Sequence, residues 1–137
     1  MLECTNNSRY RESQTTHFVL GDTHTGVAIA EQLQMNGHSV TMITKTHGSD
    51  IVPVIQGSPT DVELLIESGL ETATSVIIGA QSDARNLLIA QLIRVHFDIP
   101  QTTVLVYNPE RLSAVAEAGH EALCVTTVLS ETVAEHV

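Results

Sequence analysis

Six residues early in the chain have the types and spacing of a loop that binds a phosphate group. Residues 21–26 read GDTHTG and follow the apolar run 17–20, HFVL. Glycines spaced in this way between a strand and a helix are typical of the G-x-G-x-x-G loop of dinucleotide-binding folds. Gly21 and Gly26 fit this pattern, but Thr23 stands where a glycine would let a pyrophosphate meet the backbone. Free amides at the helix start, with the side chains of residues 23–25, still predict an anion site.

The end of the next apolar run, residues 39–44 (SVTMIT), is the second place where a ligand would be recognised. A dinucleotide site usually has an acid here that accepts the ribose hydroxyls. This sequence has Thr44 and Lys45 instead, and these two residues can hold the 2′-phosphate of NADP. Lys45 is the only lysine of the chain, and the alternative interpretation is that it is a solvated loop charge.

Other residue types that could do chemistry give weaker signals. Asp83 and Asn86 lie one turn apart at the start of a predicted helix, where they either face the loop or anchor the helix. The seven histidines show no H-x-x-x-H or Cys-His spacing, so we expect no metal site. Cys124 is predicted to be a small core residue. Asp22 and His24 lie two apart in the loop and could transfer a proton, but no nucleophile elbow accompanies them, so we do not expect catalysis by this pair.

Strands and helices that alternate along the chain must position these residues. The predicted strands are 17–20, 39–44, a third within 51–56, 75–78, 103–106 and 123–125. The predicted helices are 27–36, 60–68 from a Thr60/Glu63 capping box, 82 or 83 to 97, 109–118, and a terminal helix over 129–137 with Ser130 as its cap. The long central helix should lie on the sheet through Leu87, Leu88, Ala90, Gln91, Leu92 and Val95.

The strands are apolar throughout rather than alternating, which indicates a sheet covered on both faces. Such a sheet is parallel and doubly wound, because helical crossovers join its strands. Right-handed crossovers then favour the Rossmann-like order 3-2-1-4-5-6 for the six strands. We therefore predict an α/β fold with a terminal helix.

Length and charge limit the class of protein further. The chain has 137 residues, enough for one domain, and we expect a flexible leader over 1–15 and a folded domain over 16–137. A net charge of −10 repels phosphate backbones and anionic lipids, so nucleic acid is not an expected partner. No apolar run is long enough for direct membrane insertion, and no signal peptide is evident. We expect a cytoplasmic location, peripheral to a membrane if a transporter is the partner.

Several short motifs, taken in order, resemble the N-terminal domain of the RCK family (regulator of potassium conductance, also called TrkA-N). The resemblance covers residues 17 to about 130. The motifs are 21–26, 37–40 (GHSV), 56–60 (QGSPT), 67–73 (ESGLETA), 82–86 (SDARN), 108–110 (NPE) and 118–122 (AGHEA). Each motif is weak alone, but their order and spacing are specific.

The resemblance implies a non-enzymatic regulatory domain of a potassium channel or uptake system. Such a domain forms a homodimer or a higher ring, here through residues 82–106 and the terminal helix, and passes ligand occupancy to a membrane pore. The implied ligand is NAD(H), NADP(H) or an adenine nucleotide. Thr23, Thr44, Ser58 and Leu105 depart from the family pattern, which predicts altered or lost nucleotide affinity and leaves open that no cofactor binds. The predicted cofactor-binding residues are Gly21, Asp22, Thr23, His24, Thr25, Gly26, Thr44, Lys45, Ser58, Pro59, Ala80 and Gln81.

Two other functions remain open from the sequence. The first is an NAD(P)-binding oxidoreductase fragment, although hydride transfer needs a substrate pocket across the nicotinamide and no second domain is evident to supply it. The second is a free-standing ligand sensor that serves no pore.

Overall fold

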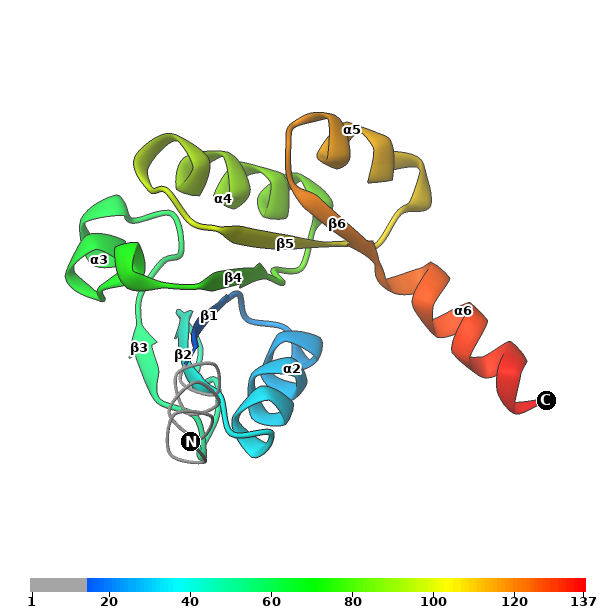
Figure 1. Ribbon diagram of the computed structural model, residues 1–137, viewed down its shortest axis with the longest axis horizontal. Helices are drawn as coiled ribbons and strands as arrows, with labels where there is room; N and C mark the ends of the chain where they lie inside the picture. Colours follow the sequence, from blue (N-terminus) through cyan, green and yellow to red (C-terminus); the bar gives the residue numbers. More distant parts are fainter. Residues whose placement is uncertain (1–14) are drawn as a thin grey trace, which may run out of the picture.

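A six-stranded parallel sheet forms the centre of the molecule (Figure 1). The computed structural model describes residues 15–137, so most of the predicted leader lies outside the described residues. The sheet order is β3-β2-β1-β4-β5-β6, which confirms the predicted Rossmann-like topology. The strands are β1 (Thr16–Leu20), β2 (Ser39–Thr44), β3 (Val54–Gln56), β4 (Ser75–Ile78), β5 (Gln101–Val106) and β6 (Glu121–Cys124).

Helices cover both faces of this sheet. They are α2 (His24–Met35), α3 (Val62–Glu67), α4 (Asp83–His96), α5 (Leu112–Glu117) and α6 (Val125–His136), with short 3-10 helices η1 (Leu70–Thr72) and η2 (Pro109–Arg111). Helices α3, α4 and α5 lie on one face and α2 on the other, while α6 projects away from the sheet (Figure 1). Within residues 15–137, no helix combines the length and the apolar character needed to cross a membrane.

The alternation of side chains along each strand produces two separate cores. In β1, Phe18 and Leu20 belong to the larger core under α3, α4 and α5, whereas Val19 belongs to the smaller core under α2. Ile43 and Met42 of β2 divide between the two cores in the same way. Each strand must therefore be apolar on both faces, which explains the continuous apolar runs in the sequence.

Two helix starts differ from the predictions because other side chains cap them. Helix α2 begins at His24 rather than residue 27, since the Thr23 hydroxyl accepts a hydrogen bond from the Gly26 amide. The predicted Thr60 capping box is wrong: Asp61 caps α3 by accepting from the Leu64 amide at 3.3 Å. A short polar side chain thus provides the cap bond at each helix start, from Thr23 and from Asp61.

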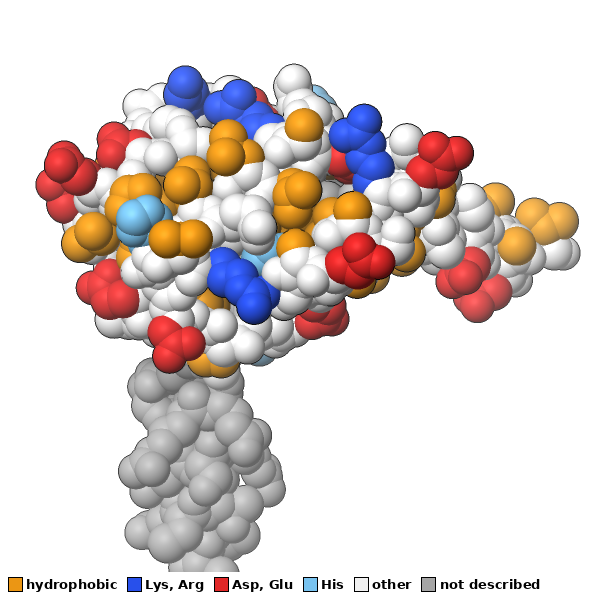
Figure 2. Space-filling view, turned by 90° about the horizontal axis from the view of Figure 1, so that it is seen from above, with side chains coloured by type: hydrophobic (Ala, Val, Ile, Leu, Met, Phe, Trp, Pro, Cys, Tyr) orange, Lys and Arg blue, Asp and Glu red, His pale blue; other side chains and the backbone are white. Residues whose placement is uncertain are grey.

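The predicted sheet-facing side of α4 is rotated from the observed one. Leu88 and Val95 are 53% and 77% exposed, and hydrophobic side chains are visible among charged ones on this face in Figure 2. The buried residues of α4 are Asn86, Ile89, Ala90 and Ile93. Apolar residues occur almost all round this helix, so their spacing did not define one face. Asn86 was wrongly left out of the predicted buried side because it is polar.

The C-terminal elements also begin earlier than predicted. Helix α6 starts at Val125, directly after β6, without a capping side chain. Ser130, the predicted cap, lies inside the helix and donates its hydroxyl to the Thr126 carbonyl at 2.7 Å. The segment predicted as one helix over 109–118 is divided into η2 and α5.

Asn86 joins the ends of two central strands. Its side-chain amide donates to the carbonyls of Ala80 and Leu105 at 3.3 and 2.9 Å, and its carbonyl oxygen accepts from the Ala80 amide at 2.6 Å. The Asn86 side chain is fully buried, so no water could take over its hydrogen bonds to these backbone groups. Asn86 therefore anchors the loop between β4 and α4 to the end of β5.

We expect Asn86→Ala to lower the free energy of unfolding by about 3 kcal/mol, because it leaves buried backbone groups unpaired. Chemical denaturation measures this change. The control is Asn108→Ala, which removes an exposed cap bond to Glu110 and should cost about 1 kcal/mol. Equal losses in the two variants would contradict the anchoring role of Asn86.

Candidate functional site

The candidate site lies at the carboxyl edge of the sheet, between β1 and β4. The chain runs from β1 outward to β2 and β3, and then returns to β4 on the other side of β1. Leu20, the last residue of β1, pairs with Ile43 of β2 and Ile78 of β4. The loops after these strands diverge here, and such a point of divergence is where open α/β sheets bind ligands.

The turn after β1 depends on a glycine at position 21. Gly21 has a φ of +143°, and a Cβ there would overlap the carbonyl of Gly79 at the end of β4. Its amide donates to the Ile43 carbonyl at 3.2 Å. The loop can pass this closely between β2 and β4 only because the residue has no side chain.

Thr23 fastens the loop to the sheet. Its hydroxyl donates to the Gly79 carbonyl at 2.7 Å and accepts from the Gly26 amide at 3.1 Å. The methyl-bearing side chain thus occupies the position at which a glycine would admit a pyrophosphate. The loop keeps the shape of a phosphate-binding turn, but one of its amide donors is used by the protein itself.

A small pocket opens at this edge. Its volume is about 20 Å³, enough for a water molecule, so a nucleotide would lie across it rather than inside it. It is lined by Gly21, Asp22, Thr44, Lys45, Pro59, Ala80 and Arg85. Six of the predicted residues therefore meet around one depression, together with an arginine that was not predicted.

The other predicted residues lie around this pocket without lining it. Gln81 borders a neighbouring depression beside Tyr107, and Thr25 lines an apolar groove next to α6. The Ser58 hydroxyl is 2.7 Å from that of Thr60. His24 is exposed in the first turn of α2.

Positive charge is concentrated at the pocket. Residues 15–137 contain four Lys and Arg side chains, Lys45, Arg85, Arg94 and Arg111, and two of them line it. In a chain with a net charge of −10, this makes the pocket a local site for an anion. The Asp22 carboxylate in the same lining opposes the effect in part.

Arg85 was missed because, within residues 82–86, only the polar residues Asp83 and Asn86 were weighed as residues that could face the loop. Its amide donates to the Ser82 hydroxyl, so it is the third residue after the cap of α4. A basic residue in the first turn of a helix that follows a central strand is the signal that was available, since that turn faces the carboxyl edge.

Thr44 takes the place of the usual ribose-binding acid but faces inward. It is fully buried, its hydroxyl is 3.0 Å from the Thr46 hydroxyl, and it accepts from the Thr46 amide at 3.2 Å. These contacts shape the turn that presents Lys45. The ribose hydroxyls of a bound dinucleotide would find no carboxylate at the end of β2.

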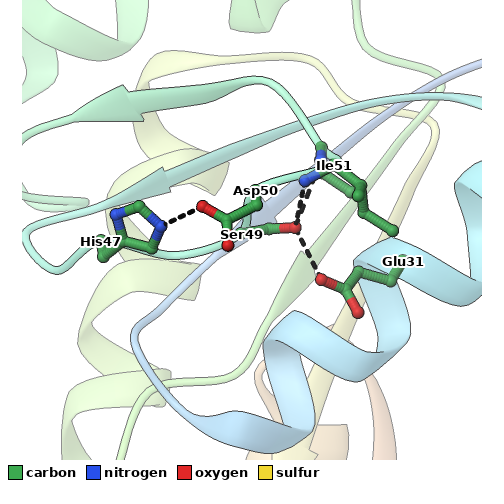
Figure 3. A network of polar contacts seen from close by, with 6 residues as sticks. Glu31, His47, Ser49, Asp50 and Ile51 are labelled. Atoms are coloured by element: carbon green, nitrogen blue, oxygen red, sulfur yellow. Dashed lines mark hydrogen bonds and ion pairs between the residues drawn. The ribbon is translucent and has the colours of Figure 1, made fainter.

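A polar network holds the rest of that loop against α2 (Figure 3). The Ser49 hydroxyl donates to Glu31 at 2.7 Å and accepts from the amides of Ile51 and Val52. The His47 ring lies 2.6 Å from the Asp50 carboxylate at the surface. The loop that begins with Lys45 is therefore fixed at its start by β2 and at its middle by α2.

Asp83 joins α4 to the end of β5. Its two carboxylate oxygens accept from the backbone amides of Tyr107 and Asn108 at 2.7 and 2.9 Å. Asp83 and Asn86 together anchor the helix, which is one of the two alternatives that the sequence left open for them. Cys124 is buried, which confirms its prediction as a core residue.

A larger cavity of about 410 Å³ lies at the amino edge of β5, lined by Arg94, Asp98 and His120 among others. Arg94 donates to the Ala118 carbonyl at the end of α5, and His120 contacts the Gln91 side chain at 2.8 Å. Burial and, to a lesser extent, Arg94 lower the pKa of His120. The negative ends of two helices and Asp98 face this cavity, so it suits an anion poorly.

A family model described as the TrkA-N domain matches residues 17–130. No curated protein matches the chain in sequence. The NAD(P)-binding domain of an exopolyphosphatase-related protein from Archaeoglobus fulgidus superposes with a TM-score of 0.78 at 22% identity, covering 88% of this chain and 95% of that one.

Two further solved structures share the fold. The Kef CTD of Shewanella denitrificans in its AMP-bound form has a TM-score of 0.77 at 14% identity, covering 87% of this chain and 76% of that one. The GsuK channel bound to NAD has a TM-score of 0.68 at 19% identity, covering 80% of this chain. This chain matches only 21% of the length of the channel chain.

The double role of Thr23 predicts opposite effects on stability and binding. Thr23→Gly should lower the free energy of unfolding by about 1 kcal/mol, because the cap and the bond to Gly79 are lost. It should also raise affinity for NAD, because the backbone becomes accessible to a pyrophosphate. Denaturation and calorimetric titration measure the two effects. Thr23→Ala is the control, with a similar loss of stability and no gain in affinity; a gain there would contradict the steric explanation.

Proposed function

This chain belongs to the TrkA-N domain family, and from that premise we propose that it is the ligand-sensing regulatory domain of a potassium transport system. In this proposal residues 16–137 bind NAD(P) or an adenine nucleotide at the carboxyl edge of the sheet. Occupancy is passed to a membrane pore formed by a partner subunit on whose cytoplasmic side the domain lies. The domain acts by binding and catalyses no reaction.

The observation that carries the proposal is the meeting of Lys45 and Arg85 beside the glycine turn. They come from the ends of different segments, β2 and the first turn of α4, and the fold brings them to one pocket. A nucleotide phosphate is the ligand class that two cations and a helix N-terminus recognise together. The NAD bound to the GsuK channel and the AMP bound to the Kef CTD belong to the same class.

The changed residues favour a phosphorylated ribose over a free one. Thr44 offers no carboxylate to a 2′-hydroxyl, and Lys45 follows it directly. A 2′-phosphate would be attracted by the positive charge of Lys45, whereas the neutral 2′-hydroxyl of NAD would gain little from it. We therefore infer that NADPH binds more tightly than NADH, with both weakened by Thr23.

Hydrogen bonds link the pocket region to the terminal helix. Asp83 of α4 holds the Tyr107 amide, and the Tyr107 carbonyl accepts from the Thr126 hydroxyl of α6 at 2.9 Å. Asp83 is two residues from Arg85 in the first turn of the same helix. A displacement of α4 on ligand binding would thus reach the base of α6, which supports α6 as the element that transmits occupancy.

We further infer that a second copy of the chain covers α6. All residues of α6 except Val125 are exposed, and none of its residues is buried. Leu129 of α6 borders an apolar groove of about 420 Å³ whose other walls include Ile29 and Leu123. Because α6 projects from its own domain (Figure 1), the apolar side needs an external partner, and a symmetric dimer would cover both copies together.

The ligand proposal predicts a charge-dependent preference. NADPH should raise the melting temperature more than NADH, AMP or ATP, since ligands that bind the folded state stabilise it. Lys45→Gln should remove the preference, and Arg85→Gln should weaken all these ligands about tenfold. Thermal shift and calorimetry measure this.

Arg94→Gln is the matched control, because it removes the same charge at the opposite edge of the sheet and should leave ligand affinity unchanged. The absence of a shift with all of these nucleotides would end the proposal that this chain senses them, and an unchanged preference in Lys45→Gln would contradict the role given to that side chain.

The dimer proposal predicts that Leu129→Glu yields a monomer, because it puts a charge into an apolar interface. Light scattering after size exclusion gives the mass in solution. Ala134→Glu adds the same charge at an exposed position about 140° round the helix from Leu129, and should leave the dimer intact. A wild-type monomer at the highest soluble concentration would refute this part of the proposal.

A further inference from the structure

Two histidines meet at the amino edge of the sheet, at the opposite end of β1 from the pocket. His17 is the second residue of β1, and His38 directly precedes β2, so the parallel pairing of these strands brings the two histidines together although they are distant in sequence. Their rings are perpendicular, with centroids 4.9 Å apart. His17 Nε2 and His38 Nδ1 lie 2.9 and 3.2 Å from the same atom, the Thr15 hydroxyl oxygen. Two ring nitrogens therefore point at one place.

A buried serine orients the first of these rings. His17 Nδ1 is 2.8 Å from the hydroxyl of Ser75, which starts β4 and is only 5% exposed. When Nδ1 carries the proton and donates to Ser75, the lone pair of Nε2 is directed at the shared place. Metal-binding histidines usually have such a partner on the second ring nitrogen, because it fixes the tautomer and the direction of the ring.

The electrostatic surroundings favour a cation here. Helix α2 ends beside His38, whose amide donates to the Leu33 carbonyl at 3.1 Å, and no basic residue lies in the last turn of this helix. The carbonyl end of a helix carries a partial negative charge, and the whole chain carries a net charge of −10.

We propose that His17 Nε2 and His38 Nδ1 together bind one divalent transition-metal ion of the zinc class at the amino edge of the sheet. The ion takes the place of the Thr15 hydroxyl, and the rings move inward by about 1 Å to reach the usual distance of about 2.0–2.1 Å. His38 then carries its proton on Nε2, so no net proton is released. Imidazole nitrogens select zinc, nickel and copper over magnesium, which prefers oxygen ligands.

The site differs from a closed structural zinc centre. Within residues 15–137, no group of three or more His, Cys, Asp and Glu side chains is placed to hold a metal. Two protein nitrogens thus leave the remaining positions of the ion to water. Metal ligands are recognised in a sequence by close spacing along the chain, which these two histidines lack, because strand pairing brings them together.

The test is a calorimetric titration of the full chain with Zn²⁺, in a Cys4→Ser background so that this thiol does not compete. We expect one ion per chain, with no binding of Mg²⁺. His17→Gln and His38→Gln should each weaken Zn²⁺ binding at least tenfold. His47→Gln and His96→Gln are the matched controls and should leave it unchanged. In NMR spectra the ring protons of His17 and His38 should shift before those of the other histidines.

Two further variants keep both histidine rings, so their effects on Zn²⁺ binding do not depend on whether the histidine variants fold. Ser75→Ala should weaken binding by freeing the His17 tautomer, and Thr15→Ala should leave binding intact or tighter, because the hydroxyl no longer competes for the nitrogens. Equal Zn²⁺ affinity in the wild type and in folded His17→Gln and His38→Gln variants would overturn the proposal. So would ring signals of His17 and His38 that do not respond to Zn²⁺.

Discussion

The close passage of the first loop across the end of β4 is the constraint on which the site depends. Gly21 has no room for a side chain against Gly79, and the Thr23 hydroxyl then ties the same carbonyl to the start of α2. These contacts hold the loop after β1 against the end of β4 and fix the start of α2 at the carboxyl edge. Because both groups of contacts lie within the protein, the loop holds its shape without a ligand.

That arrangement separates the shape of a nucleotide fold from its recognition chemistry. The shape consists of the glycine turn, the strand order and the starts of α2 and α4 at the carboxyl edge. Any ligand bound at this edge would need the same shape. The groups that distinguish one nucleotide from another have changed, with Thr44 buried where an acid is usual and Lys45 next to it. A family fold can therefore persist while its preference shifts, since different residues control the two properties.

The accuracy of sequence-based prediction here follows the strength of the local signal. Strands β2 and β4 were predicted with their observed bounds, because both are apolar runs between clear breaks. The buried side of α4 was predicted wrongly because apolar residues occur almost all round this helix. In addition, Asn86 is buried through hydrogen bonds that only the fold reveals. Likewise, pocket residues within the glycine loop and after β2 were found from spacing, whereas Arg85 and the His17 and His38 pair come together only through strand order.

The direct junction of β6 and α6 gives the molecule a lever arm. With no loop between Cys124 and Val125, the helix axis is set by the last sheet strand. Twelve residues at a rise of about 1.5 Å give an arm of about 18 Å, so a tilt of about 10° at its base would displace its tip by about 3 Å. A small rotation of β6 would therefore move the tip of α6 by several ångströms.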